Sequence, residues 1–518
     1  MRNYILKHEK QVLRFFEILP GVFSWNMILL PYWGIFLFPN FVAYFVLLFN
    51  IYWFYQSFLI AITSVISHTK IQAAIGYDWV SDLKTFPDWE KVHNIVIIPT
   101  YKEPLYILER TINSLVKQTL PTKMMTIILA MEEREPREAR NAKFHSISSK
   151  FGNNFRNFIQ TVHKLKVDEV VGKASNEKFA AVWYKEHYIN NDSLPLRGKK
   201  NFIDKQSLPL RGKEKMDINY LTVTSCDADH KYHPNHFACL SFKFLDCPTR
   251  YRHFWQPAVM FFNNIWELPA ITRVPNTFGS IWNLSQLPRK DRLINAQNYS
   301  LSYKLLDEVG YWDADKIPED WGIFFKAYYK VKGGLEVEPI YLPLHADAAQ
   351  STTTWKTIKA QYEQYRRWAW GTSDDSWIIK NYLIDTEIPF WDKTTRLGFV
   401  LWAHFMWPVN WFIITIGLTL PTLINPAFGR TTLGYMVPKL SSIILTLSLG
   451  FLIILFFINN IYKPKRPETV SIWRTILTPF EFILMPIVGF FFSALPGIDA
   501  HTRLMLGKYI EYKVTEKV

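Results

Sequence analysis

Asp227 and Asp229 are the residues whose types and spacing point most directly to chemistry. They follow a run rich in β-branched residues from 220 to 225, which predicts a buried strand, and both carboxylates can face one ligand beyond its carboxyl end. Carboxylate oxygens suit Mg²⁺ or Mn²⁺, and a substrate diphosphate can complete the coordination shell. The same pattern is more often a turn with an Asx cap, so the metal hypothesis needs partners elsewhere in the chain.

Two further strand ends carry polar side chains. Residues 94–98 and 125–131 are apolar runs, and residues 105–118 between them are amphipathic with helical spacing. Strand, helix and strand in this order predict a right-handed parallel unit, and ligands of such sheets bind outside the carboxyl ends of the strands. The residues at these two ends are Pro99, Thr100, Tyr101, Glu103, Glu132 and Glu133.

A series of motifs, in order along the chain, resembles those of inverting family 2 glycosyltransferases with the GT-A fold. The motifs are Pro99 to Glu103, Glu132 with Glu133, Gly172 to Asn176, Asp227 to Asp229, Gln256 with Pro257, Gly310 to Asp313, Pro318 to Asp320 and Gln364 to Trp368. The last resembles the Gln-x-x-Arg-Trp signature of membrane-embedded polysaccharide synthases in the cellulose synthase-like branch. The resemblance implies an α/β GT-A domain, a Rossmann-like nucleotide-diphospho-sugar transferase, joined to α-helical transmembrane segments.

The resemblance also implies roles at the nucleotide end. Pro99, Thr100, Tyr101 and Glu103 would line the uridine or guanosine, and Asp227 would contact the nucleotide as well as the metal that it shares with Asp229. Glu132 or Glu133 would bond the base or ribose; the family usually has two aspartates here, so the sequence leaves open which glutamate does so. Lys173 would reach the diphosphate, although alone it would pass for a surface lysine at a helix start.

The pair Glu319 and Asp320 supplies the candidate catalytic residues. An inverting transfer needs a carboxylate that takes the proton from the acceptor hydroxyl, and Asp320 is the expected base. The metal would stabilise the charge that develops on the leaving diphosphate. Without the other motifs, this pair would equally be the acidic start of a helix.

Gln364, Arg367 and Trp368 fall on one expected helix, where a three-residue step places side chains on neighbouring positions of one face. The arginine can hold a pyrophosphate, and the indole offers a flat platform for the acceptor sugar. The alternative is an interfacial helix with an arginine that snorkels to the headgroups, and both descriptions can hold for one helix.

The histidines at 230, 233 and 236 invite a zinc hypothesis, which we do not favour. Pro234 interrupts any helix that would align them. We expect the three histidines to be loop residues near the metal site.

Apolar residues are concentrated in parts of the 518-residue chain, which is 49% hydrophobic and 16% aromatic. No charge occurs from 18 to 67, enough for two membrane crossings with a hairpin near Pro39, and two clear charge-free stretches follow residue 396. A third stretch, from 482 to 498, is either a full crossing or a short re-entrant or interfacial segment. The net charge of +14 fits basic cytoplasmic loops better than nucleic acid, so we expect no nucleic-acid partner.

These boundaries predict the organisation of the chain. The expected parts are residues 1–67 with two transmembrane helices, a GT-A domain over 68–354 with a basic insertion at 185–217, interface helices over 355–395, carboxyl-terminal transmembrane helices over 396–498 and a basic tail over 499–518. Basic residues before the first crossing place the catalytic domain in the cytoplasm of a multi-pass protein, which we expect in a bacterial plasma membrane. The only cysteines, three in number, fit a reducing compartment.

The tail contains Val514, Thr515 and Lys517, in a pattern that resembles the gating loop of bacterial cellulose synthases. A basic frayed terminus is the alternative.

We therefore expect a membrane-bound, metal-dependent inverting glycosyltransferase. It would transfer a sugar from a UDP- or GDP-sugar to a growing polysaccharide, processively, with Mg²⁺ or Mn²⁺ as cofactor and lipid around its helices. Two alternatives remain open: a single transfer to a lipid-linked acceptor, and a non-catalytic membrane scaffold or translocation partner that binds a nucleotide sugar.

Overall fold

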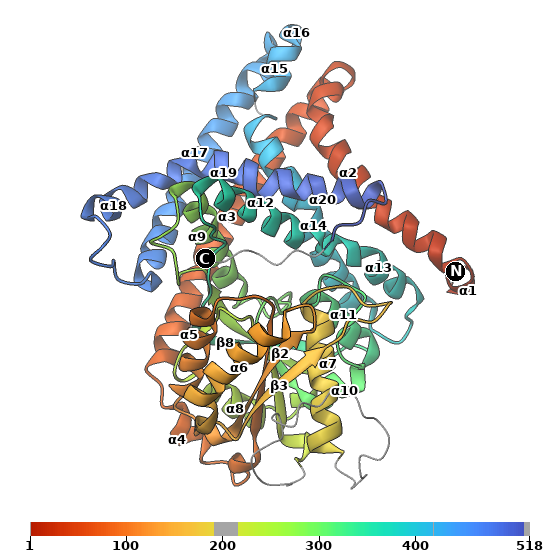
Figure 1. The fold of residues 1–518 in the computed structure, drawn as a ribbon. Coiled ribbons are helices and arrows are strands. Elements are labelled where there is room, and N and C mark those ends of the chain that lie inside the picture. Colours follow the sequence, from red (N-terminus) through yellow and green to blue (C-terminus); the bar gives the residue numbers. More distant parts are fainter. Residues whose placement is uncertain (1, 191–215, 418, 512–518) are drawn as a thin grey trace.

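A computed structural model describes residues 2–190, 216–417 and 419–511. Figure 1 shows a sheet domain in the lower half of the molecule and long apolar helices in the upper half. Helices α9 (Ala270–Gln286) and α12 (Thr354–Ala369) lie between the two. The site must therefore be sought where the sheet domain meets these helices.

The sheet has eight strands in the described part of the chain, in the order β3-β2-β1-β4-β7-β6-β8-β5. Strands β3, β2, β1 and β4 are parallel to one another, β7 is antiparallel to β4 and to β6, and β6 pairs with β8 in parallel. The strands are β1 (His93–Thr100), β2 (Met125–Glu132), β3 (Asn157–His163), β4 (Leu221–Ser225), β5 (Lys231–Tyr232), β6 (His253–Met260), β7 (Tyr299–Ser302) and β8 (Glu336–His345).

The first half of the sheet forms as the apolar runs predict. β2 and β4 are buried along their whole length, because helices cover both faces of a parallel sheet. The amphipathic helix α5 (Leu105–Val116) connects β1 to β2 and ends two residues before the predicted end. The predicted strand, helix and strand unit is confirmed, with β1 and β2 in parallel register.

Helices on the two faces of the sheet complete the sheet domain. Two large apolar clusters pack there, one around Val96, Leu129 and Trp255 and the other around Ile97 and Phe324. The helices of the sheet domain are α4 (Trp79–Leu83), α6 (Arg137–Phe151), α7 (Lys173–Tyr184), α8 (His236–Asp246), α10 (Tyr303–Val309) and α11 (Asp320–Lys330).

Five helical segments of the described residues are long and apolar enough to cross a membrane. The first two are α2 (Glu9–Leu37) and α3 (Pro39–Ile75), which meet at Phe38 where the sequence predicts a hairpin. Two more are α14 (Phe390–Thr415) and α17 (Thr432–Tyr462), one in each predicted charge-free stretch. The shorter helices nearby are α1 (Arg2–Lys7), α13 (Asp375–Ile384), α15 (Leu420–Ile424) and α16 (Pro426–Gly429).

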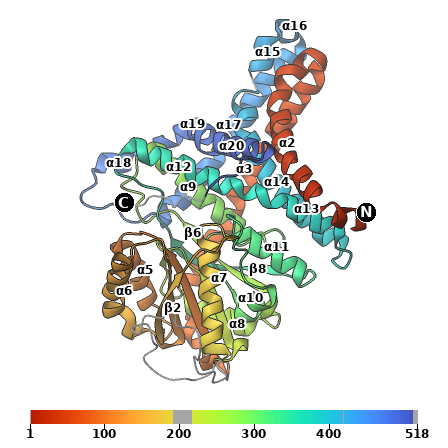
Figure 2. The same cartoon turned by 45° about the vertical axis from the view of Figure 1, so that its right-hand side comes forward.

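The fifth segment, residues 472–505, has a different direction from the others. It consists of α18 (Ile472–Leu477), the 3₁₀ turn η8 (Thr478–Leu484), α19 (Met485–Gly489), the π-helical turn η9 (Phe490–Ala494) and α20 (Leu495–Met505). Figures 1 and 2 show this segment lying across the upright helices α2, α3 and α17. This direction favours the interfacial alternative over a further crossing.

Two predictions from the sequence fall on residues that the structure does not describe. Val514, Thr515 and Lys517 lie outside the described residues, as does most of the insertion at 185–217. Neither prediction is tested.

Candidate active site

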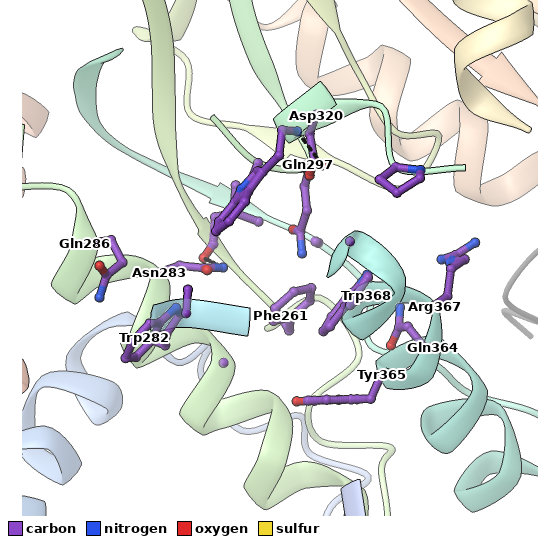
Figure 3. Close-up of a pocket in the computed structure, with 18 of the residues that line it drawn as sticks. Phe261, Trp282, Asn283, Gln286, Gln297, Asp320, Gln364, Tyr365, Arg367 and Trp368 are labelled. Carbon is purple, nitrogen blue, oxygen red and sulfur yellow. Dashed lines mark hydrogen bonds between the residues drawn. The ribbon is translucent and has the colours of Figure 1, made fainter. Parts of the chain in front are cut away.

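A cavity of about 540 Å³ lies where the carboxyl ends of the strands meet α9, α12 and α14. Nearly every site residue predicted from the sequence lines it: Pro99, Thr100, Tyr101, Glu103, Glu132, Lys173, Asp227, Asp229, Glu319, Asp320, Gln364, Arg367 and Trp368. Glu133 does not line it and is exposed. Figure 3 shows Asp320, Phe261 and Trp368 around the cavity. The fold therefore brings together side chains that are more than 250 residues apart in the sequence.

Asp227, Asp229 and His230 form a group that could hold a metal ion. Their ligand atoms all lie within 4.8 Å of one another. Asp229 is 2% exposed, and its Oδ2 accepts a hydrogen bond from the backbone N–H of Asp347 at 2.9 Å. Two carboxylates and an imidazole make a donor set for a divalent cation, and His230 belongs to it as well as the two predicted aspartates.

Asp347 is a site residue that the sequence analysis missed. It lines the cavity and accepts two hydrogen bonds of 2.6 Å from Arg110, whose Nη2 reaches both carboxylate oxygens. The signal was present: Asp347 follows the end of β8, in the same way that Asp227 follows β4. A single acidic residue after the last strand of the described chain is weak evidence on its own, because it belongs to no recognisable motif.

The zinc hypothesis for the three histidines finds no support among the described residues. Only His230 belongs to a group that could hold a metal. His236 is fully buried at the start of α8, against Tyr232 and Phe237. Burial lowers the pKa of His236 to about 3, so its imidazole is neutral and part of the core.

Lys173 is the centre of the charged part of the cavity. Its Nζ lies 2.9 Å from Asp227 Oδ1 and 2.7 Å from Glu319 Oε1, and it donates a 2.7 Å hydrogen bond to the carbonyl of Gln297. Burial lowers the pKa of Lys173, but the carboxylates of Asp227, Glu319 and Glu177 outweigh it and hold the pKa well above its usual value. Lys173 is therefore a permanent positive charge between the metal group and the acidic pair.

Glu177 adds a third carboxylate that the sequence analysis did not single out. It is completely buried one helical turn after Lys173 on α7, accepts a 2.6 Å hydrogen bond from Ser225 Oγ, and lies 3.9 Å from Lys173 Nζ. Burial raises the pKa of Glu177, and Lys173 opposes that shift. Glu177 thus helps to hold the ammonium group of Lys173 in place.

Asp320 is held at the first residue of α11 by two backbone groups. Its Oδ2 accepts a hydrogen bond from the N–H of Gln297 at 3.1 Å, and its Oδ1 accepts one from the N–H of Trp321 at 2.9 Å. Burial raises the pKa of Asp320, against the effect of these two N–H groups and of Lys173. A carboxylate fixed in this way, with a pKa above its ordinary value, suits a general base.

The neighbour Glu319 is committed to an ion pair. Burial raises the pKa of Glu319, Lys173 opposes the shift, and Asp320 adds to it. Because Glu319 contacts Lys173 directly, the two acidic residues have different surroundings, which leaves Asp320 as the better base.

The loop after β1 is folded around Glu103. The carboxylate accepts a 2.6 Å hydrogen bond from Thr100 Oγ1 and another from the backbone N–H of Tyr101. Burial raises the pKa of Glu103. The Tyr101 ring lies under the guanidinium of Arg134, 4.6 Å from its centroid, so an aromatic face and an arginine meet at this end of the cavity.

Of the two glutamates after β2, only Glu132 is positioned toward the cavity. It is buried, and its Oε1 accepts a 3.0 Å hydrogen bond from Asn176 Nδ2, while Oε2 pairs with Arg134. Glu133 is exposed, because the two residues point to opposite sides of the chain at the strand end.

Helix α12 brings the Gln-x-x-Arg-Trp residues to the opposite wall. Gln364 accepts a 3.2 Å hydrogen bond from Gln361, which in turn accepts a 2.6 Å bond from Asn276 of α9. The ring centroids of Trp368 and Phe261 are 5.7 Å apart, and Figure 3 shows these two rings beside each other below Asp320. The three predicted residues thus lie on one helix, as expected, and line the cavity from it.

Residues 223–458 match the family model described as glycosyl transferase family group 2. This part of the chain is a family 2 glycosyltransferase domain. The match begins in β4 and ends in α17, so it includes Asp227, Asp320, Arg367 and three of the helices that line the cavity, α9, α12 and α14. The strands before it, β1 to β3, continue the same sheet, and together they form the curled mixed sheet of a GT-A glycosyltransferase fold.

Comparison with solved structures adds looser likenesses. The mannosyltransferase PcManGT from Pyrobaculum calidifontis, in complex with GDP-Man and Mn²⁺, is 11% identical, with 80% of this chain and 99% of that chain covered at a TM-score of 0.43. S. aureus TarS 1-349, in complex with UDP-GlcNAc, is 12% identical, with 82% and 94% covered at a TM-score of 0.36. A search of curated proteins found no match.

Proposed function

We propose that this glycosyltransferase is an inverting, metal-dependent membrane enzyme that transfers a sugar from a UDP- or GDP-sugar to a growing polysaccharide. The proposal rests on one cavity that contains both the charged residues of a transfer site and a wall of aromatic and amide side chains from the apolar helices. Helices α2, α3, α14 and α17 would cross the membrane, and residues 472–505 would lie at its cytoplasmic surface.

The charged residues divide the work of binding the donor. Tyr101 and Glu132 would contact the base and ribose, and Lys173 would hold the diphosphate as a point charge. Asp227, Asp229 and His230 would hold the divalent cation, which would neutralise charge on the leaving nucleotide. An imidazole ligand suits Mn²⁺ better than Mg²⁺, so Mn²⁺ is the favoured cofactor.

Asp320 would act on the acceptor. The acceptor oxygen forms a bond to the anomeric carbon while the bond from that carbon to the diphosphate breaks. The hydroxyl proton goes to Asp320, and the electron pair leaves with the nucleotide diphosphate. The backbone N–H groups of Gln297 and Trp321 fix the Asp320 carboxylate before the reaction, so no side-chain reorganisation is needed when the proton moves.

The wall formed by the apolar helices favours an extended sugar acceptor. Aromatic rings follow one another from Trp321, next to Asp320 in α11, to the apolar helices: Trp321 contacts Phe399, Phe399 stacks on Trp402, and Trp402 stacks on Trp282. Flat ring faces and amide groups are what a chain of sugar rings needs for stacking and hydrogen bonding. Other residues of this wall are Phe278, Asn283, Trp407, Asn410, Trp411, Phe492 and Ser493.

The test is nucleotide release by purified protein in lipid, with UDP- and GDP-sugars screened against Mg²⁺ and Mn²⁺. Asp320→Asn should abolish donor-dependent release, whereas Asp315→Asn, an exposed acid of the preceding loop, should not change it. A short lipid-linked product would instead indicate a single transfer. Nucleotide binding without release from any donor would contradict the enzymatic proposal and favour the scaffold alternative.

A further inference from the structure

His404 and Asp375 form a buried pair beside the cavity that the proposed transfer does not use. His404 lies in α14 and is 6% exposed, and Asp375, the first residue of α13, is completely buried. Their Nδ1 and Oδ1 atoms are 2.7 Å apart, and the other oxygen of Asp375 accepts a 3.1 Å hydrogen bond from Thr372 Oγ1. Such a pair fixes both the orientation of the imidazole and the position of its proton.

The pair leaves one ring nitrogen for a ligand. Because Nδ1 donates to the Asp375 carboxylate, Nε2 is the atom that remains, and no hydrogen bond among the described residues reaches it. Gly371 lies opposite this nitrogen and also lines the cavity. A Cβ at position 371 would sit only 3.3 Å from Nε2, so the absence of a side chain there keeps the space in front of the nitrogen open.

The surroundings of His404 connect it to Asp320 and to Trp368 through their neighbours in the chain. The His404 ring stacks on Trp321, with centroids 5.0 Å apart, and Trp321 is the residue that donates its N–H to Asp320. Gly371 follows Trp368 by three residues, about one helical turn. All of these residues line the same cavity.

We infer that the Asp375–His404 pair is an acceptor subsite, in which Nε2 of His404 hydrogen-bonds a hydroxyl group of the sugar that accepts the transfer. This inference rests on the proposed function and adds a specificity residue to it. Asp375 is a positioning residue, since it acts through the imidazole. The ligand class is a sugar with a free hydroxyl beside the one that reacts.

Two variants test the subsite in different ways. His404→Phe combined with Asp375→Asn removes the nitrogen, keeps a ring against Trp321 and avoids leaving an unpaired buried carboxylate. Gly371→Ala keeps the pair but places a methyl group in front of Nε2. Gly398→Ala, within α14 and with open space around its Cβ, is the matched control.

The first measurement uses the enzyme in lipid with a radiolabelled donor, and compares label transferred to product with label released as free sugar by water. Both variants should lower the ratio of transfer to hydrolysis by about tenfold or more, because water does not need the subsite, and Gly398→Ala should leave the ratio unchanged. A parallel fall of transfer and hydrolysis would mean that His404 only supports the position of Trp321 and Asp320. That result, or an unchanged ratio, would overturn the inference.

The second measurement does not depend on turnover. Tryptophan fluorescence is titrated with cellotetraose, mannotetraose and chitotetraose in the absence of donor. At least one should bind the wild-type protein, and both variants should weaken it about tenfold. If the wild-type enzyme released no nucleotide, the proposed function would fail, while equal affinities in all proteins, or no binding by any, would overturn the subsite separately.

Discussion

The two ends of the cavity carry different kinds of polar group. At the strand ends, Lys173 is surrounded by carboxylates, and Asp229 and Asp320 are held by backbone N–H groups. On the side of the helices, Asn410 Oδ1 and Trp407 Nε1 are buried with no partner in the described part of the chain, although both residues line the cavity. One end is organised before any ligand binds, and the other has hydrogen-bonding groups that a sugar could satisfy.

The difference indicates that the two ends of the cavity contribute to different steps of the transfer. Charges at the strand ends are preorganised, so they can stabilise the developing charge of the transfer without moving. The aromatic rings and the Asn410 amide on the helices would contact several positions of a sugar chain and would hold no single position strongly. We therefore expect mutations at the first end to affect rate and mutations at the second to affect product length.

The largest effect is expected from Asp229→Asn. Loss of one metal ligand should lower nucleotide release by about a hundredfold or more, because the charge of the leaving diphosphate loses its counter-charge. When nucleotide release is measured at increasing Mn²⁺ concentrations, it should depend less on the metal in Asp229→Asn than in the control Asp315→Asn. Equal activity with and without divalent cations in the wild-type enzyme would contradict the metal assignment.

Lys173→Met should have the next largest effect, and it should act in two ways. Removing the ammonium leaves several carboxylates of a buried cluster unpaired, which should lower the free energy of unfolding by about 3–5 kcal/mol. Donor KM should rise about 10- to 100-fold in the protein that remains folded, because a charge-assisted contact to the diphosphate is lost. Lys178→Met, on the same helix and outside the cavity, should change neither thermal unfolding nor donor KM.

The pH dependence follows from the raised pKa of Asp320. A base must be ionised, so activity should fall as the pH falls through that pKa, above the usual range of about 4 for an aspartate. Since the folded state binds this proton more tightly than the unfolded chain, acidification through the same range does not destabilise the fold through this group. Rate and thermal unfolding measured together should separate, and loss of both at one pH would contradict the assignment.

The smallest effect is expected on the side of the helices. Asn410→Leu keeps the volume but removes the amide, and a single neutral hydrogen bond is worth about 1 kcal/mol, so the transfer rate should change less than about fivefold. The product should become shorter, as sizing of labelled polymer can show. Asn459→Leu is the matched control: its amide oxygen, on α17, is also buried without a partner among the described residues, but it does not line the cavity.

The charged end could be predicted from the sequence because each motif is local. A strand followed directly by acidic residues places them at one edge, and the parallel order of β2, β1 and β4 brings these edges together. The choice between Glu132 and Glu133 needed the structure, since it depends on which way a strand end turns. His230 was recognised as a neighbour of the metal site, and its ligand atom now completes the group with Asp227 and Asp229.

The other end could not be predicted. Trp282 of α9, Trp402 of α14 and Phe492 of η9 are each ordinary residues of apolar helices, and only packing brings their rings to one cavity. The same holds for Asp375 and His404, which are 29 residues apart on two helices. The sequence leaves the orientation of residues 482–498 open for a similar reason, because the length and composition of that stretch suit both a crossing and an interfacial position.

Processive transfer is tested most directly by the length of the labelled product at early times, when most donor is still unused. The product is made by purified wild-type enzyme in lipid, with its active donor and Mn²⁺. Long chains are expected from the start, because a sugar chain held along the aromatic wall stays bound between additions. A product with one added sugar on a lipid, or chains that lengthen only as the donor is consumed, would contradict processive transfer.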